Sequence, residues 1–177
     1  MEIRRVSVTD LQQLQIIARS TFAESFAYGN SEDNMSKYLE TEFSTDKLRT
    51  EIENKHSEFY FAVTDGNIVG YLKINTGPAQ TEVQKAPTLE IERIYVLKAY
   101  HGKQVGRRLF ETALERGRAL GVDYLWLGVW EHNPRAIRFY EKNGFVVFDK
   151  HVFKLGEEEQ TDLMMKLELE KDPAREV

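Results

Sequence analysis

Hydrophobic positions along this chain recur with two spacings, which predict helices interleaved with strands. Apolar residues three or four positions apart are typical of an amphipathic helix, and apolar residues at every second position are typical of a strand. Helical spacing covers 11–22, part of 26–43, 45–54, 105–120 and 134–143. Alternating or continuous apolar runs cover 2–6, 59–63, 69–73, 88–97, 122–130, 145–153 and 161–170. We therefore predict an α/β (α+β) fold.

The fourth predicted strand changes phase partway along its length. Its apolar residues alternate as Leu89 and Ile91, and they resume out of step as Ile94 and Val96. One extra residue near Glu92 explains the slip, and this is how a β-bulge looks in a sequence. A bulge splays the strand from its neighbour and leaves backbone N–H and C=O groups unpaired. We therefore expect a ligand to pair with the backbone there.

A glycine-bearing turn into a helix follows this strand directly. The turn, AYHGKQVGRRL, places Lys103, Arg107 and Arg108 beside the first turn of the predicted helix. The N–H groups of a first helical turn point outward and bind phosphate, and neighbouring basic side chains add favourable charge. Strand and turn together predict an enzyme that binds a pyrophosphate group.

Length and cysteine content limit the remaining possibilities. A chain of 177 residues with 41% hydrophobic content is long enough for one well-filled core and short for two domains. It contains no cysteine, which excludes disulfides, cysteine-ligated metals and a thiol nucleophile. The four histidines are scattered without paired ligand spacing, so we expect no metal site.

Charge and hydropathy indicate the compartment and the partners. A net charge of −5 disfavours general binding to nucleic acid and mildly favours cationic ligands. No apolar run approaches the roughly 18 residues of a membrane span, and the N-terminus lacks the apolar core of a signal peptide. We therefore expect a cytoplasmic protein that binds neither membranes nor nucleic acid. The sequence leaves a homodimer open.

The order of strand, phosphate turn, helix, strand and helix resembles the GNAT superfamily of acetyl-CoA-dependent N-acetyltransferases. The resemblance implies a single domain over 1–170, with a mixed, mostly antiparallel seven-stranded sheet and a splayed central strand, and 171–177 as a frayed tail. The family's pyrophosphate signature is Gln or Arg, two residues, Gly, one residue, then Gly or Ala. His101, Gln104 and Gly106 occupy these positions, so only the last one matches. We expect binding to survive, because Gln104 can still donate its backbone N–H if it sits in ordinary helical geometry.

The same resemblance implies contacts with acetyl-CoA. In the family the pantetheine arm adds to the bulged strand like a short extra strand, which implies backbone contacts at Ile94, Tyr95 and Val96. The diphosphate lies on the turn, and the implied contacts are His101, Gly102, Lys103, Gln104, Val105, Gly106 and Arg107. Lys142 would reach the adenosine phosphate end, although a solvated surface lysine is the simpler interpretation.

The segment NPRAIRFYEKNGF, 133–145, is similar to the family's second cofactor segment. Asn133 and Tyr140 are seven residues apart, so they lie on one side of a helix, two turns from each other. Asn133 also suits an N-cap before Pro134, and Tyr140 also suits a core position. The resemblance implies that Asn133 and Tyr140 contact the cofactor and that Tyr140 protonates the departing thiolate.

Other segments are similar to the bacterial PaiA-type spermidine/spermine N-acetyltransferases. These segments are STFAESF, NSEDNMSKYLE, LEIERIYV, WLGVWE and GEEEQTDLMM. The resemblance implies a polyamine acceptor, which agrees with the acidic charge. Candidate acceptor contacts are carboxylates that would bind the cation and aromatic rings that would enclose its methylene groups: Glu24, Glu32, Asp33, Glu42, Glu157, Glu158, Glu159 and Asp162, and Phe22, Phe26, Tyr28 and Trp130. Solvated acids and core aromatics are the alternative interpretations.

The transfer requires a proton acceptor, because a polyamine nitrogen is protonated in neutral water and must lose a proton before it attacks a thioester. Glu92 lies at the predicted bulge, and we predict that it is the base or that it anchors a water that removes the proton. The alternative is that Glu92 forms an ion pair with Arg93 or Lys73 on the sheet. Direct transfer is the expected order, since no cysteine can hold the acetyl group.

Two other functions compete with polyamine acetylation. The acceptor could instead be a protein N-terminus, an aminoglycoside or an amino acid, because the acceptor pocket is built from the segments that the sequence specifies least. A protein that binds acetyl-CoA or polyamines without turnover, as a regulator, is the second alternative. Nothing in the sequence resembles a basic recognition helix, so direct DNA binding is not expected.

Overall fold

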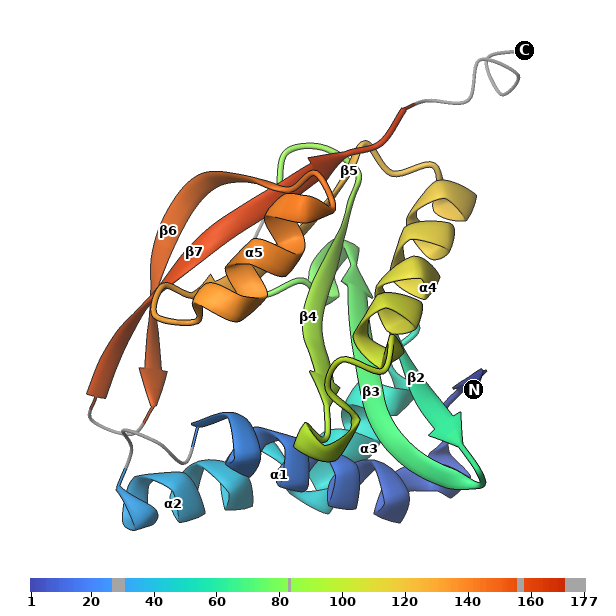
Figure 1. The fold of residues 1–177 in the computed structure, drawn as a ribbon, viewed down its shortest axis with the longest axis vertical. Coiled ribbons are helices and arrows are strands. Elements are labelled where there is room, and N and C mark those ends of the chain that lie inside the picture. Colours follow the sequence, from blue (N-terminus) through green and yellow to red (C-terminus); the bar gives the residue numbers. More distant parts are fainter. Residues whose placement is uncertain (27–30, 83, 156–157, 171–177) are drawn as a thin grey trace.

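The computed structural model describes residues 1–26, 31–82, 84–155 and 158–170, and it contains one sheet with helices on both faces (Figure 1). The strands are β1 (Glu2–Arg5), β2 (Ser57–Thr64), β3 (Asn67–Thr76), β4 (Thr88–Val96), β5 (Tyr124–Trp130), β6 (Val146–Leu155) and β7 (Glu158–Glu168). The helices are α1 (Leu11–Phe26), α2 (Glu32–Glu42), α3 (Thr45–Glu53), α4 (Val105–Leu120) and α5 (Pro134–Lys142). The predicted tail, 171–177, lies outside the described residues.

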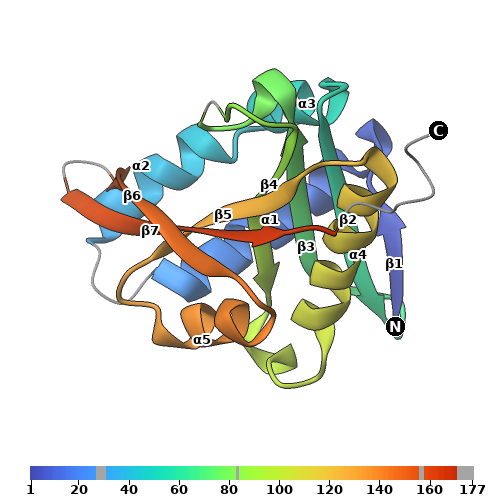
Figure 2. The same ribbon diagram turned by 90° about the horizontal axis from the view of Figure 1, so that it is seen from above.

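The sheet has seven strands in the order β1-β2-β3-β4-β5-β7-β6. Every neighbouring pair is antiparallel except β4 and β5, which are parallel. The predicted mixed, mostly antiparallel seven-stranded sheet is therefore confirmed. Helices α4 and α5 cover one face, and α1, α2 and α3 lie on the other (Figure 2). None of the helices described combines the length and the apolar character needed to span a membrane.

The predicted bulge lies in β4 at Glu92. Lys73 of β3 pairs with Arg93, whereas the next residue of β3, Ile74, pairs with Ile91, so Glu92 has no partner in the β3 ladder. The parallel pairing between β4 and β5 ends with Glu90, opposite Trp126. Beyond this point the two strands are no longer hydrogen-bonded, and the predicted splaying of the central strand is confirmed.

The phase slip sorts the side chains of β4 between two hydrophobic clusters. Leu89 and Ile91 are buried in the cluster that α4 and α5 cover, and Ile94 packs against the same cluster beyond the bulge. Tyr95 packs against the second cluster, which includes the buried residues of α1 and α3. Without the extra residue, the strand beyond the bulge would present its polar side chains to the α4 cluster.

Candidate functional site

A cleft of about 1010 Å³ lies between β4, β5 and the starts of α4 and α5, and α1 and α2 also contribute to its wall. It opens where β4 and β5 stop pairing. The residues predicted to form the site that line this cleft are Phe22, Glu24, Phe26, Glu42, Glu92, Ile94, Tyr95, Val96, His101, Gly102, Gln104, Val105, Gly106, Arg107, Trp130, Asn133, Tyr140 and Asp162. The predicted residues that are exposed and do not line it are Glu32, Asp33, Lys103, Lys142 and Glu159. Tyr28, Glu157 and the side chain of Glu158 lie outside the described part of the chain.

The turn before α4 leaves room for a bulky group at the helix start. A Cβ atom built on Gly102 would meet nothing within 4 Å, and one on Gly106 would meet only Val96 Cγ2, at 3.9 Å. The two predicted cations, Arg107 and Lys103, have different partners. Arg107 is paired with Glu111, with 2.9 Å between Nε and Oε1, and the Lys103 ammonium lies 4.9 Å from the centre of the Tyr100 ring.

The ring of His101 joins two walls of the cleft. Nε2 of His101 lies 2.8 Å from the carbonyl oxygen of Val96, and its Nδ1 lies 2.7 Å from an Nη atom of Arg135. Because a carbonyl only accepts and a guanidinium only donates, the ring carries its proton on Nε2. Arg135 of α5, a cation that lines the cleft close to the turn before α4, was not among the predicted site residues.

Gln104 is not in the ordinary helical geometry on which we based the donation of its N–H. It is the N-cap of α4 with φ 67° and ψ 2°, in the left-handed region. The family's signature has glycine at this position, and glycine adopts such a conformation without a steric penalty. In a residue with a Cβ atom the same conformation costs about 1 to 2 kcal/mol. The departure from the signature is therefore a local strain at the start of α4.

Gln104→Gly is expected to raise the free energy of unfolding by about 1 kcal/mol or less, because the relief of strain is partly offset by the greater freedom of glycine in the unfolded chain. Urea unfolding measures the change. The control is Gln104→Ala, which keeps a Cβ atom and therefore keeps the strain. Equal stability of the Gly and Ala variants would show that this backbone position is not left-handed.

Helix α5 places Asn133 and Tyr140 along the cleft. The side chain of Asn133 caps the helix, with Oδ1 accepting from the N–H of Ala136 at 3.1 Å, as the N-cap interpretation predicted. Tyr140 is 7% exposed, and burial, with a smaller effect of Tyr95, raises the pKa of its phenol. The phenol therefore stays protonated at neutral pH. Tyr140 packs in the core and also lines the cleft, so both interpretations of this residue are compatible with the structure.

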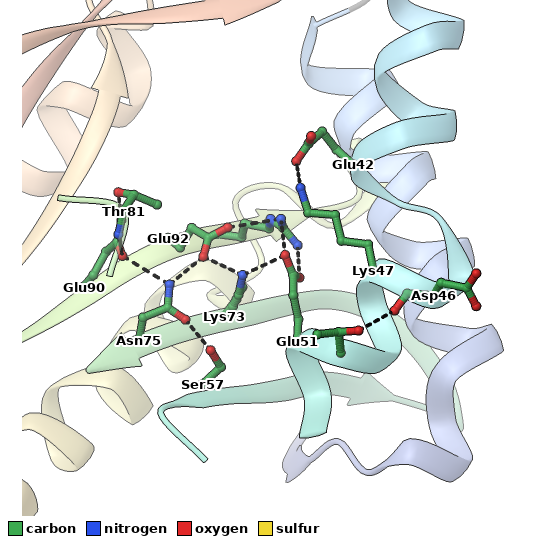
Figure 3. A network of polar contacts seen from close by, with 12 residues as sticks. Glu42, Asp46, Lys47, Glu51, Ser57, Lys73, Asn75, Thr81, Glu90 and Glu92 are labelled. Carbon is green, nitrogen blue, oxygen red and sulfur yellow. Dashed lines mark hydrogen bonds and ion pairs between the residues drawn. The ribbon is translucent and has the colours of Figure 1, made fainter. Parts of the chain in front are cut away.

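Beneath the bulge, Glu92 belongs to a buried network of charges (Figure 3). Its carboxylate contacts Lys73 Nζ at 2.5 Å and Arg93 Nη2 at 3.1 Å, and both cations also contact Glu51. The ion pairs that we gave as the alternative to a catalytic role for Glu92 are thus present. Burial alone would raise the pKa of Glu92, but the charges of Arg93 and Lys73 hold it below its ordinary value. A carboxylate stabilised in this way is a weak proton acceptor.

Glu90, two residues before the bulge, has a different environment. It is 3% exposed, and its carboxylate accepts from neutral groups: the backbone N–H and hydroxyl of Thr81, and Asn75 Nδ2 at 3.1 Å. Burial raises the pKa of Glu90, the charge of Glu92 raises it further, and the hydrogen bonds from Thr81 and Asn75 oppose the shift. Glu90 lines the cleft at the point where β4 and β5 separate. Glu90 was not among the predicted site residues, although strand alternation places it on the same face as Glu92.

Phe22 and Glu24, two of the predicted acceptor residues, lie at the α1 side of the cleft. The Phe22 ring stacks on Phe26 and Tyr38, with centroids 4.4 and 4.7 Å apart, so it is part of an aromatic cluster as well as of the cleft wall. The carboxylate of Glu24 accepts from the backbone N–H of Lys98 at 2.8 Å. Trp130, at the end of β5, is half-buried and faces the cleft.

Comparison with known proteins agrees with this geometry. The Acetyltransferase (GNAT) family matches residues 22–145. An uncharacterised N-acetyltransferase in the pepI 3′ region of Lactobacillus delbrueckii subsp. lactis is 45% identical over 166 residues, which cover 94% of this chain and 96% of that one. A spermidine N(1)-acetyltransferase from Thermoplasma acidophilum is 28% identical, over 84% of this chain and 90% of that one.

A similar fold occurs in the crystal structure of a PaiA N-acetyltransferase from Thermoplasma acidophilum in complex with coenzyme A. The TM-score is 0.77 at 26% sequence identity, and the match covers 95% of this chain and 98% of that one. The bulged strand, the open turn before α4 and the cleft between β4 and β5 thus occur in a chain whose family and fold are both established. The chain belongs to the GNAT family, and it is an acetyl-CoA-dependent N-acetyltransferase.

Proposed function

We propose that this enzyme acetylates a primary amine of a polyamine such as spermidine or spermine. The observation that carries the proposal is Glu90, a buried carboxyl group that lines the cleft and whose hydrogen-bond partners among the described residues are all neutral. Burying a carboxylate without a cation is costly, and a cationic acceptor would supply the missing charge. A relative named as a spermidine N(1)-acetyltransferase supports the same acceptor class.

The residues of the cleft fit acetyl-CoA. Beyond Glu90 the β5 side of β4 has no strand partner, and Ile94, Tyr95 and Val96 line the cleft there. These residues would hold the pantetheine arm, while 101–102, 104–107 and Arg135 would hold the diphosphate. When bound, acetyl-CoA supplies the acetyl group as a thioester. Lys103 and Lys142 are less well placed to contribute, because neither lines the cleft.

The transfer moves an acetyl group from sulfur to nitrogen, so the nitrogen loses one proton and the sulfur gains one. We propose that a Glu90 carboxylate oxygen accepts the proton from the amine, directly or through a water. Its raised pKa makes it a better acceptor than Glu92, whose pKa is lowered. In this proposal Glu92 and its network hold the bulge in place, so that the N–H of Ile94 or Tyr95 can stabilise the developing oxyanion, at about 3 kcal/mol.

Tyr140 is the proposed proton donor to the leaving sulfur. Its raised pKa keeps the phenol protonated until the sulfur departs. A thiolate that forms in the same buried region also has a raised pKa, so the transfer is less uphill than it would be in water. Because the chain has no cysteine, we propose direct transfer between the two bound substrates.

An amine panel with acetyl-CoA tests the proposal by release of free thiol. Spermidine and spermine are expected to give a kcat/KM at least about tenfold above those of a peptide N-terminus, an aminoglycoside and an amino acid. A higher value for one of these three would identify another acceptor. Binding of acetyl-CoA without thiol release for any amine would support the regulatory alternative.

A further inference from the structure

The far end of the cleft contains a row of three side chains on three neighbouring strands. His151 of β6 lies opposite Asp162 of β7, and Asp162 lies opposite Trp130 of β5. Directly opposed residues of antiparallel strands point to the same face of the sheet. All three line the same cleft as Glu90 and Tyr140.

We propose that Asp162 and Trp130 bind a second ammonium group of the acceptor, one that does not react, so that the enzyme selects amines with two or more positive charges. This proposal rests on the acetylation of amines proposed above, and it adds a residue that determines specificity. The carboxylate supplies the opposite charge, and the indole face supplies a cation–π contact.

The carboxylate of Asp162 lies beside a backbone position that has no side chain. Gly128, two residues before Trp130 on β5, is exposed, and a Cβ atom built there would lie 3.4 Å from Asp162 Oδ2 and 3.4 Å from His151 Cε1. Any side chain at Gly128 would therefore fill the space next to the carboxylate. Glycine leaves that space to a ligand.

No lysine or arginine within the described ranges forms an ion pair with Asp162. The nearest basic group is His151, whose Nε2 lies 3.9 Å from Asp162 Oδ2, longer than a hydrogen bond. The side chain of Asp162 is 17% exposed, and burial raises its pKa although His151 opposes the shift. A largely buried carboxylate without a close cation is costly, and an ammonium group of the acceptor would offset that cost.

The spacing along β5 separates this site from the reacting end. Glu90 lies opposite Trp126, and Asp162 reaches Gly128, two residues further along the same strand. Two residues of a strand span about 7 Å. A short aliphatic linker between two amines bridges such a distance, so one nitrogen can approach Glu90 while another contacts Asp162.

Asp162→Asn tests the site, because it removes the charge and keeps the shape. The readout is the ratio of kcat/KM for putrescine to kcat/KM for butylamine, two amines that differ by one ammonium group. The wild-type ratio is expected to exceed one, and the variant is expected to lower it by about tenfold or more, the usual effect of losing a charged hydrogen bond. The control is Asp149→Asn, an exposed aspartate of β6, which is expected to keep the wild-type ratio.

A second variant and a binding measurement test the same proposal if the first experiment cannot be carried out. Trp130→Leu is expected to lower the same ratio, and it serves if Asp162→Asn does not fold. If the wild-type enzyme acetylates no amine, the proposed function fails, and calorimetric titration of putrescine and butylamine into the coenzyme A complex still tests the second site. An unchanged ratio of rates or affinities in the Asp162 variant, or an equal loss for both amines, would overturn the proposal.

Discussion

Glu92→Gln is expected to lower the free energy of unfolding by about 3 kcal/mol. The side chains of Lys73 and Arg93 are 5% and 10% exposed, and within the described part of the chain the carboxylates that contact them are Glu92 and Glu51. Neutralising Glu92 leaves two buried cations to share Glu51, and an uncompensated buried charge is strongly destabilising. Urea unfolding at neutral pH, followed by circular dichroism, measures the difference.

The dependence of the free energy of unfolding on pH, measured in acid, gives a second test of Glu92. The folded-state pKa of Glu92 lies below its ordinary value of 4.5, so the unfolded chain takes up the proton first as the pH falls. The contribution of Glu92 is therefore fully present above that value and is lost as the pH falls through the folded-state pKa. Glu92→Gln is expected to reduce the fall in stability over this acidic range.

Glu90→Gln is the matched control, since it makes the same substitution two residues before Glu92 on the same strand. The partners of Glu90 are neutral and its pKa is raised, so loss of its charge is expected to change the unfolding free energy by about 1 kcal/mol or less at neutral pH. Its effect should appear in kcat. Wild-type stability of Glu92→Gln together with a large loss of kcat would instead restore Glu92 as the proton acceptor.

Local patterns in the sequence predicted the elements that position the cleft. The slip in the alternation at Glu92 requires no knowledge of distant residues, because it follows from the period of two in a strand. The N-cap at Asn133 follows in the same way from Asn, Pro and the apolar spacing of the helix after them. Both features are confirmed, and together they place β4 and α5 beside the cleft.

Features that depend on tertiary neighbours could not be predicted in this way. Glu90 and Glu92 share a strand face, and only their partners give one a raised pKa and the other a lowered one. Those partners come from β3, from Thr81 in the loop before β4 and, for Arg93, from β4 itself. Asp162 and Trp130 are brought together by the register of β5 and β7, which the spacing of apolar residues does not encode. The left-handed backbone at Gln104 is indicated only by the glycine that the family's signature has at this position, because glutamine itself disfavours that conformation.

Tyr140→Phe is expected to lower kcat by about 10²-fold, the lower end of the contribution of a positioned general acid. Phenylalanine keeps the ring that packs against Phe139 and Phe145, at centroid distances of 5.4 and 5.5 Å, so the core around α5 is retained. The dissociation constant of coenzyme A is expected to stay nearly unchanged. Stopped-flow measurement of thiol release in a single turnover isolates the chemical step from product release.

A second tyrosine separates loss of the proton donor from loss of a buried hydroxyl. Tyr60 on β2 is 9% exposed and has a pKa raised to about 12 by burial and by Glu58, yet it does not line the cleft between β4 and β5. Tyr60→Phe is therefore expected to keep the wild-type kcat, whatever it does to stability. If Tyr140→Phe also keeps the wild-type kcat and only lowers the free energy of unfolding, Tyr140 is a core residue, and the proton that the sulfur gains must come from water or from another group in the cleft.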